Sequence, residues 1–146
     1  MTCKAMFLGA SVILPVLLLS PVGTGTGEAV AASGCRPPLE PWTQVELYFG
    51  RGLRGKAVVS EEAFERFLTK VVTPLFPDGL SLVDVAGQFR DSEGRLIREP
   101  TKLLILLVPD AAAVAPDVET IATTYKERFG HQSVLHAEQP VCVAFR

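Results

Sequence analysis

Acidic, amide, phenolic and basic side chains recur along three strand-like stretches of this sequence, where together they could bind a ligand and transfer a proton. The candidate residues are Glu46, Tyr48, Asp84, Gln88, Arg90 and Lys102. A carboxylate or a phenol can exchange a proton with a bound molecule, and a guanidinium group can hold an anion. If helices cover one side of the sheet, we expect all six side chains on the opposite, open face.

The same pattern also has a simpler explanation. An antiparallel sheet commonly turns one polar face to water, and Glu46 with Arg90 could be an ordinary cross-strand pair. We therefore predict a non-enzymatic binding or interaction module that recognises a small molecule or a protein. The alternative is a small enzyme in which Glu46 or Asp84 is the base, Tyr48 the acid and Arg90 the anion holder.

The segments of the sequence that come nearest to cofactor-binding or metal-binding motifs do not match them. The segments Gly50-Arg51-Gly52 and Asp78-Gly79 lack the Lys-Ser/Thr ending of a phosphate-binding loop and are interpreted as turns. His131 and His136 are separated by an odd number of positions, which would place them on opposite faces of a strand. We accordingly expect neither a metal site nor a cofactor.

The beginning of the chain predicts export. Lys4 is followed by an uncharged, mainly apolar run to Leu19, and Ala29-Val30-Ala31 provides the small-x-small pattern of a cleavage site. The run is shorter than the ~20 residues that span a bilayer. We interpret residues 1–32 as a cleavable signal peptide and expect a periplasmic or extracellular protein without a transmembrane segment after leader removal.

Two cysteines remain after that cleavage, Cys35 and Cys142. In an oxidising compartment such a pair predicts a disulfide, which would connect the two ends of the domain. The segment Ala32-Ser33-Gly34-Cys35 also resembles a bacterial lipobox, in which Cys35 would carry a lipid. The two interpretations exclude each other, and the paired count favours the disulfide.

The rest of the chain has the size of one domain. We expect a proline-rich extended lead-in over residues 33–41 and a single domain over 42–146. The net charge is −2 at pH 7, and no basic cluster is present. The sequence therefore predicts no nucleic-acid partner.

Apolar periodicity predicts four strands and two helices that would position the candidate side chains. A helix follows Ser60 and ends at Thr73-Pro74, and a second opens at Pro116-Asp117 and ends at Gly130. The strands are expected over residues 42–50, 80–90, 96–108 and 133–145, the last broken at Gln139-Pro140.

This order, strand-helix-strand-strand-helix-strand, is the split βαβ or ferredoxin-like pattern of an α+β domain. It predicts a four-stranded antiparallel sheet in the order 4-1-3-2 with both helices on one face. The apolar run over 103–108 would then be an inner strand. A further use of the open face would be to pair with a second copy of the chain.

Several ordered motifs also resemble a known family. They are residues 46–50, 73–80, 87–90, 125–129 and 141–145. Together these segments resemble domain of unknown function family 3574, a family of exported bacterial proteins with no established activity. The resemblance implies an exported protein and brings no catalytic residues to this sequence.

Overall fold

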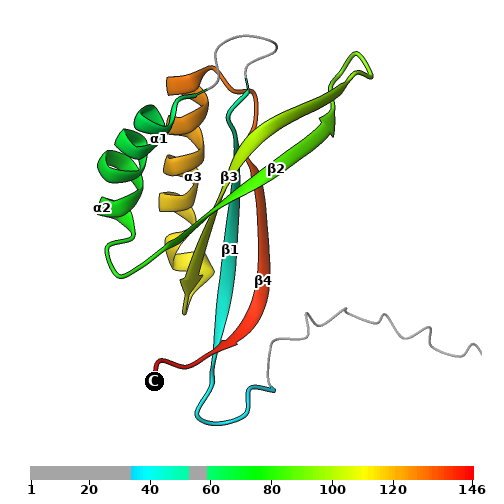
Figure 1. Ribbon diagram of the computed structural model, residues 1–146. Coiled ribbons are helices and arrows are strands. Elements are labelled where there is room, and N and C mark those ends of the chain that lie inside the picture. Colours follow the sequence, from blue (N-terminus) through cyan, green and yellow to red (C-terminus); the bar gives the residue numbers. More distant parts are fainter. Residues whose placement is uncertain (1–33, 53–58) are drawn as a thin grey trace, which may run out of the picture.

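The computed structural model describes residues 34–52 and 59–146, shown in Figure 1. The predicted leader over 1–32 lies outside these residues, as does the segment 53–58. The elements are β1 (Glu40–Gly50), α1 (Glu61–Phe67), a π-helical segment η1 (Leu68–Val72), α2 (Thr73–Leu75), β2 (Ser81–Arg90), β3 (Leu96–Val108), α3 (Ala111–Phe129) and β4 (Leu135–Val143).

The first helical region begins where predicted and continues further than predicted. The Ser60 hydroxyl accepts a hydrogen bond from the Ala63 amide, which caps α1. The predicted stop at Thr73-Pro74 is wrong, because the chain widens into η1 and continues through α2. Pro74 has no amide to donate, and the wider π turn accommodates it without ending the helix.

The second long helix, α3, begins five residues before the predicted Pro116. Asp110 is its N-cap, and its carboxylate accepts hydrogen bonds from the amides of Ala112 and Ala113. Such a cap satisfies amides that lack a partner inside the helix. Gly130 ends the helix as predicted, with a φ of 70°.

The four strands form one antiparallel sheet in the order β2-β3-β1-β4, which confirms the predicted ferredoxin-like topology. β4 runs unbroken through Pro140, contrary to the predicted interruption. A proline is tolerated there because β4 lies at an edge of the sheet, where an amide needs no second strand.

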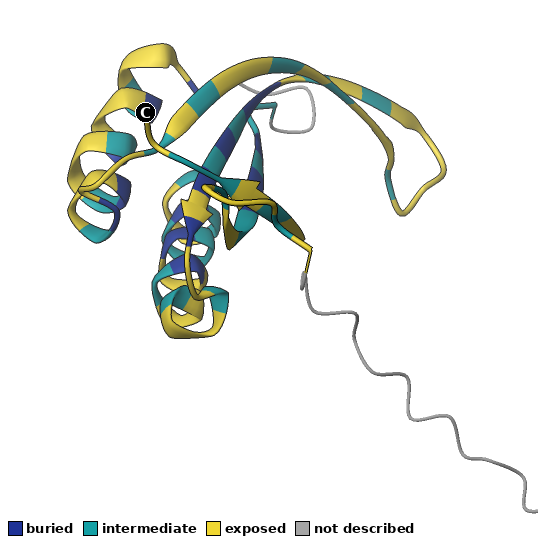
Figure 2. Ribbon diagram, turned by 90° about the horizontal axis from the view of Figure 1, so that it is seen from below, coloured by how far each residue is buried: buried dark blue, intermediate teal, exposed yellow. Residues whose placement is uncertain are grey.

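The helices cover one side of this sheet, and the core lies between the two layers (Figure 2). Val45, Leu47 and Phe49 of β1 point into it and are fully buried. Phe67 and Tyr125 meet there from the two helical regions, with ring centroids 5.2 Å apart. The Tyr125 hydroxyl donates to the Gly50 carbonyl at 3.0 Å, so even the core phenol has a partner.

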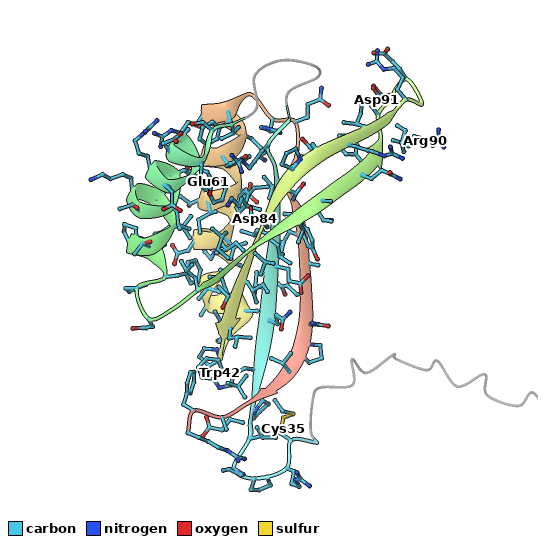
Figure 3. The ribbon with its side chains drawn as sticks, viewed as in Figure 1. Cys35, Trp42, Glu61, Asp84, Arg90 and Asp91 are labelled. Atoms are coloured by element: carbon cyan, nitrogen blue, oxygen red, sulfur yellow. A yellow bond between two sulfur atoms is a disulfide. The ribbon has the colours of Figure 1, made fainter. Side chains whose placement is uncertain are left out.

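Below the helical layer, β1 and β4 extend further, and the predicted disulfide between Cys35 and Cys142 joins the segment before β1 to β4 (Figure 3). Glu40 pairs with Val143 and Pro41 with Cys142, so the topology brings the two ends of the domain together. The Cα atoms of the two cysteines are 5.5 Å apart. This pairing favours the disulfide over the lipobox, because a lipidated Cys35 sulfur could not form it.

Candidate functional site

The strand register separates the six candidate residues, so the expectation of one shared face is wrong. Tyr48 pairs with Leu103, whereas Lys102 pairs with Phe49 of the core. Asp84 in turn pairs with Lys102. Because partners in register share a face, Glu46 and Tyr48 lie on the open face. The helix side carries the remaining four, Asp84, Gln88, Arg90 and Lys102.

Lys102 is the most buried of the six, with 4% of its surface exposed. Its ammonium group lies 2.7 Å from the Asp84 carboxylate and also bonds the Glu61 carboxylate in the first turn of α1. These hydrogen bonds, that of Asp84 first, raise the pKa of Lys102 above its ordinary value. Arg51 also pairs with Glu61, at 2.8 Å. The cluster therefore connects the start of α1 to the sheet.

Gln88 and Arg90 lie on the hairpin of β2 and β3, which projects beyond the helices. Arg90 donates to the Gly94 carbonyl at 2.9 Å, close to the hairpin tip (Figure 3). Gln88 accepts from Arg98 at 2.8 Å. Both side chains thus have partners within the hairpin itself, and Arg90 cannot act as an anion holder beside Glu46.

On the open face, Glu46 is the centre of a small hydrogen-bonded network along β1. The Gln44 amide donates to one carboxylate oxygen at 2.6 Å, and the Tyr48 hydroxyl donates to the other at 2.6 Å. The bond to Glu46 raises the pKa of Tyr48, and desolvation adds to the rise. Sequence reasoning missed Gln44, although alternation with Glu46 was a sufficient signal.

The rest of the open face is mainly apolar. Register and alternation assign to it Val83, Val85, Phe89, Leu103, Ile105, Leu107, Leu135, Ala137, Val141 and Val143. Four of these are large and well exposed: Val83, Phe89, Leu107 and Leu135, at 42% to 62%. Exposed apolar groups that gather in this way are characteristic of interaction surfaces.

The ionisable charges on this open face are all negative among the described strand residues. They are the carboxylates of Glu40, Glu46 and Glu99. The Glu99 carboxylate accepts from the Gly52 amide at 2.6 Å. The basic residues of the strands, Arg90, Arg98 and Lys102, all belong to the helix side. The open face is therefore an apolar and acidic surface.

The two histidines do not meet. His131 packs against Tyr125 with ring centroids 5.3 Å apart, while His136 on β4 lies 3.0 Å from a Glu138 oxygen. Burial lowers the pKa of His131. Over residues 34–52 and 59–146, no group of three or more His, Cys, Asp or Glu side chains could hold a metal ion. No helix in the same residues is long and apolar enough to cross a membrane.

These features define a class: a small ferredoxin-like α+β domain, closed by a disulfide, with one sheet face that the helices leave uncovered. The chain belongs to the family described as "Protein of unknown function (DUF3574)", whose profile matches residues 44–145. The family assignment confirms the resemblance noted from the sequence motifs. A search of curated proteins finds no match to the chain.

Two solved structures with TM-scores above 0.5, both of a phage SAM lyase, confirm the fold. A phage SAM lyase in complex with S-methyl-5'-thioadenosine has a TM-score of 0.56 at 14% identity, covering 71% of this chain and 90% of the lyase. The apo state of the phage SAM lyase has a TM-score of 0.53 at 14% identity, covering 72% of this chain and 90% of the lyase. CPII from Thiomonas intermedia K12, bound to ADP, AMP and acetate, has a lower TM-score of 0.46 at 17% identity, covering 73% of this chain and 92% of CPII. At such identities the likeness concerns the fold alone.

Proposed function

We propose that this protein is an exported interaction module that binds, through its open sheet face, a protein segment with apolar and basic side chains. The observation that carries the proposal is the composition of that face, which is mainly apolar and whose charged side chains, among the described strand residues, are all carboxylates. Apolar area supplies affinity, and opposite charge supplies orientation and a faster encounter.

Charge decides between several kinds of partner. Nucleic acid and anionic lipid are polyanions, and three carboxylates on this face would repel them. A second copy of the chain would bring the same three carboxylates against the first set. Like charges across an interface cost free energy, so we favour a different, basic partner over a homodimer.

Glu46 is well placed to receive a basic group. An ionised carboxylate has about four acceptor positions, and Gln44 and Tyr48 occupy two of them. These two donors fix the orientation of the carboxylate while leaving one free position on each oxygen. A lysine or arginine of the partner could therefore bind without first breaking the network, and a charge-assisted bond would form.

The small-enzyme alternative now depends on Glu46 and Tyr48 alone, because Asp84 and Arg90 lie on the other side of the sheet. The phage SAM lyase shares the fold, so the architecture itself is compatible with catalysis. A turnover by the purified mature protein that disappears in Glu46→Gln would favour this alternative and overturn the interaction module.

Binding can be tested with three synthetic peptides of equal length, in which leucine alternates with lysine, glutamate or serine. We expect the lysine peptide to bind the mature protein, the serine peptide to bind more weakly and the glutamate peptide not to bind. Backbone amide shifts in NMR spectra would locate the contact. Shifts confined to the helix side, or equal binding of all three peptides, would overturn the proposal.

Two matched variants sharpen this test. Glu46→Gln removes a carboxylate from the open face and should weaken binding of the lysine peptide roughly 3- to 10-fold. Asp84→Asn removes a carboxylate from the helix side and should leave the affinity unchanged. The same samples give the oligomeric state by sedimentation, and a stable dimer lost on Leu107→Arg would assign the face to a second copy.

Export is a separate part of the proposal. The Cys35–Cys142 disulfide supports it, because such bonds persist mainly in oxidising compartments. The intact mass of protein recovered from its native host, before and after reduction and alkylation, is the test. We expect a chain that starts near Ala32 or Ser33 and takes up two alkyl groups only after reduction. A diacylglyceryl group on an N-terminal Cys35 would overturn the disulfide and identify a lipoprotein.

A further inference from the structure

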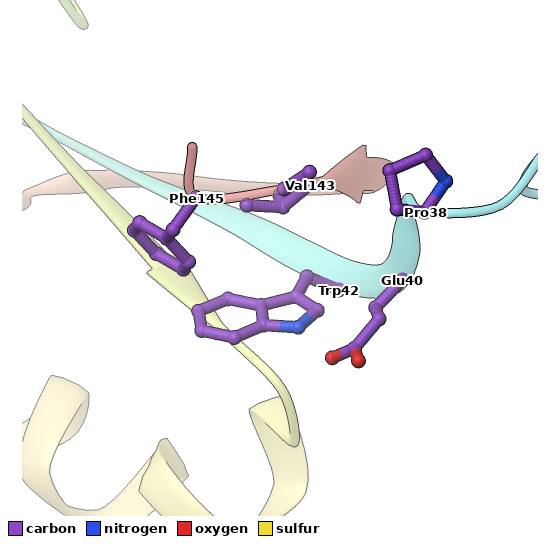
Figure 4. Close-up of a pocket in the computed structure, with 6 residues that line it drawn as sticks. Pro38, Glu40, Trp42, Val143 and Phe145 are labelled. Atoms are coloured by element: carbon purple, nitrogen blue, oxygen red, sulfur yellow. The ribbon is translucent and has the colours of Figure 1, made fainter.

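We propose that the lower end of β1 carries a binding site for an organic cation, formed by Trp42, Phe145 and Glu40. A pocket of about 240 Å³ lies here, lined by Pro38, Glu40, Trp42, Val143, Ala144 and Phe145 (Figure 4). The ring centroids of Trp42 and Phe145 are 5.6 Å apart at an interplanar angle of 62°. The two aromatic rings thus form adjoining walls rather than a closed stack.

The carboxylate of Glu40 supplies the negative charge of this site. In Figure 4 it lies on the side of the five-membered ring of Trp42, while Phe145 lies on the side of the six-membered ring. Within the part of the chain that the structure describes, no lysine, arginine or histidine forms an ion pair with Glu40. A cation in the pocket would therefore meet a carboxylate that is not already neutralised.

The aromatic walls favour the same kind of ligand. The face of an indole ring is electron-rich and attracts a positive charge within about 6 Å, and tryptophan is the best of the aromatic residues in this role. Phe145 is 80% exposed, which removes a large apolar ring from the core without an evident benefit to stability. Its position against Trp42 is explained if it forms the second wall of a site.

Size and support narrow the ligand further. The pocket is smaller than the ~300 Å³ at which drug-sized sites begin, so it fits a single head group: a quaternary ammonium, or the charged end of a lysine or arginine side chain. The base of the site is held by the pairing of Glu40 with Val143 and by the nearby disulfide. A preorganised pocket loses less free energy on binding.

This inference does not depend on the proposed function. Glu40 belongs to the open face as well, but the pocket needs only Glu40 and its two aromatic walls, whereas the peptide test reports on Glu46. A small cation can occupy it whether or not a protein binds the rest of the face. The two sources of the cationic group, a free quaternary amine or a side chain of a partner, are separated by the probes used below.

Trp42 is the only tryptophan of the chain, so its fluorescence reports on this pocket directly. We would titrate the mature, disulfide-closed protein with choline and with its uncharged carbon analogue, in which a tert-butyl group replaces the trimethylammonium group. Choline should change the emission saturably, and the neutral analogue should bind at least roughly 5-fold more weakly. N-acetyl-arginine amide tests the side-chain source in the same way.

Matched variants assign the contributions. Glu40→Gln keeps the shape of the pocket and should weaken choline binding roughly 5- to 10-fold, and Phe145→Leu should weaken it by a smaller factor. Glu138→Gln on the helix side of β4 is the control and should have no effect. Equal binding of choline and its neutral analogue, an unchanged affinity in Glu40→Gln, or no saturable response to either cation would overturn the proposal. None of these outcomes affects the binding of the lysine peptide at Glu46.

Discussion

The two sides of the sheet in this protein differ in burial and in charge, although the same four strands form both. The helix side buries a continuous apolar core and carries every basic residue of the described strands, including Lys102 beneath the start of α1. The open side exposes apolar residues, and the charged groups of its described strand residues are all carboxylates, with Glu46 held by its neighbours on β1. The helix side packs against the helices, whereas the open side is not covered by any described helix or strand.

The two sides also differ in how far apart in the sequence their interacting charged residues lie. On the helix side, a charge such as Lys102 is satisfied by residues distant in the sequence, Asp84 and Glu61. On the open side, Glu46 is satisfied by residues two positions away. The ion pairs of Lys102 connect distant parts of the chain and so help to fix the fold. The hydrogen bonds of Glu46 are local, so this carboxylate has its partners without any element packed over the open face. A surface of this kind can be altered with little effect on stability, which is the expected property of a binding face.

The largest predicted effect compares two leucines on opposite sides of β3. Leu104 is fully buried and Leu107 is 42% exposed. Leu104→Ala should reduce the free energy of unfolding by about 2–5 kcal/mol, because it removes buried methyl groups and leaves a cavity. Leu107→Ala should cost at most about 1 kcal/mol. Denaturant unfolding of the monomer measures both, and equal losses would show that a second layer already covers the open face.

Much of this contrast could be predicted from the sequence. The order of elements predicted the strand order, and the paired count of Cys35 and Cys142 predicted the disulfide. The spacing of Val45, Leu47 and Phe49 is likewise enough to place the three side chains on one face of β1. These features depend on local periodicity or on topology. Both are visible in one sequence, because the strand repeat of two and the split βαβ pattern allow few arrangements.

The candidate site could not be predicted in the same way. Polarity alone suggested that Asp84 and Lys102 share a face with Glu46, but a sheet face is set by the register between strands, and a shift of one residue reverses it. That register pairs Tyr48 with Leu103. The polar residues of β2 reach water on the helix side because the hairpin projects beyond the helices, a feature of the tertiary structure.

The second prediction concerns the ion-pair cluster on the helix side. Lys102→Met keeps an apolar stem but removes the ammonium group, and it should cost about 1–2 kcal/mol rather than the 3–5 kcal/mol of a fully buried pair. The reason is that the side chains of Glu61 and Asp84 are 50% and 76% exposed and regain water. Arg98→Met, which loses a bond on the exposed hairpin, should cost no more than about 0.5 kcal/mol.

The pH dependence of the stability difference between wild type and Lys102→Met shows whether the loss comes from charge or from packing. Because the folded protein raises the pKa of Lys102, the stabilisation is fully present below the ordinary lysine value of about 10.4 and is lost as the pH rises through the folded pKa. The gap between wild type and Lys102→Met should therefore be constant near neutral pH and shrink in alkaline solution. A gap that stays constant there would assign the loss to packing.

The smallest predicted effect lies on the open face, in the phenol of Tyr48. Its hydrogen bond to Glu46 raises its pKa, and burial raises that of the other tyrosine, Tyr125. Neither phenol should therefore ionise at its ordinary pH of about 10 in the folded wild type. In Glu46→Gln the acceptor is no longer charged, so the ultraviolet absorbance of one phenolate should appear at lower pH.

Glu138→Gln is the control for this titration and should leave it unchanged. If Tyr48 already titrates normally in the wild type, its bond to Glu46 does not orient the carboxylate, and the preorganised acceptor on the open face is lost as an argument for a basic partner.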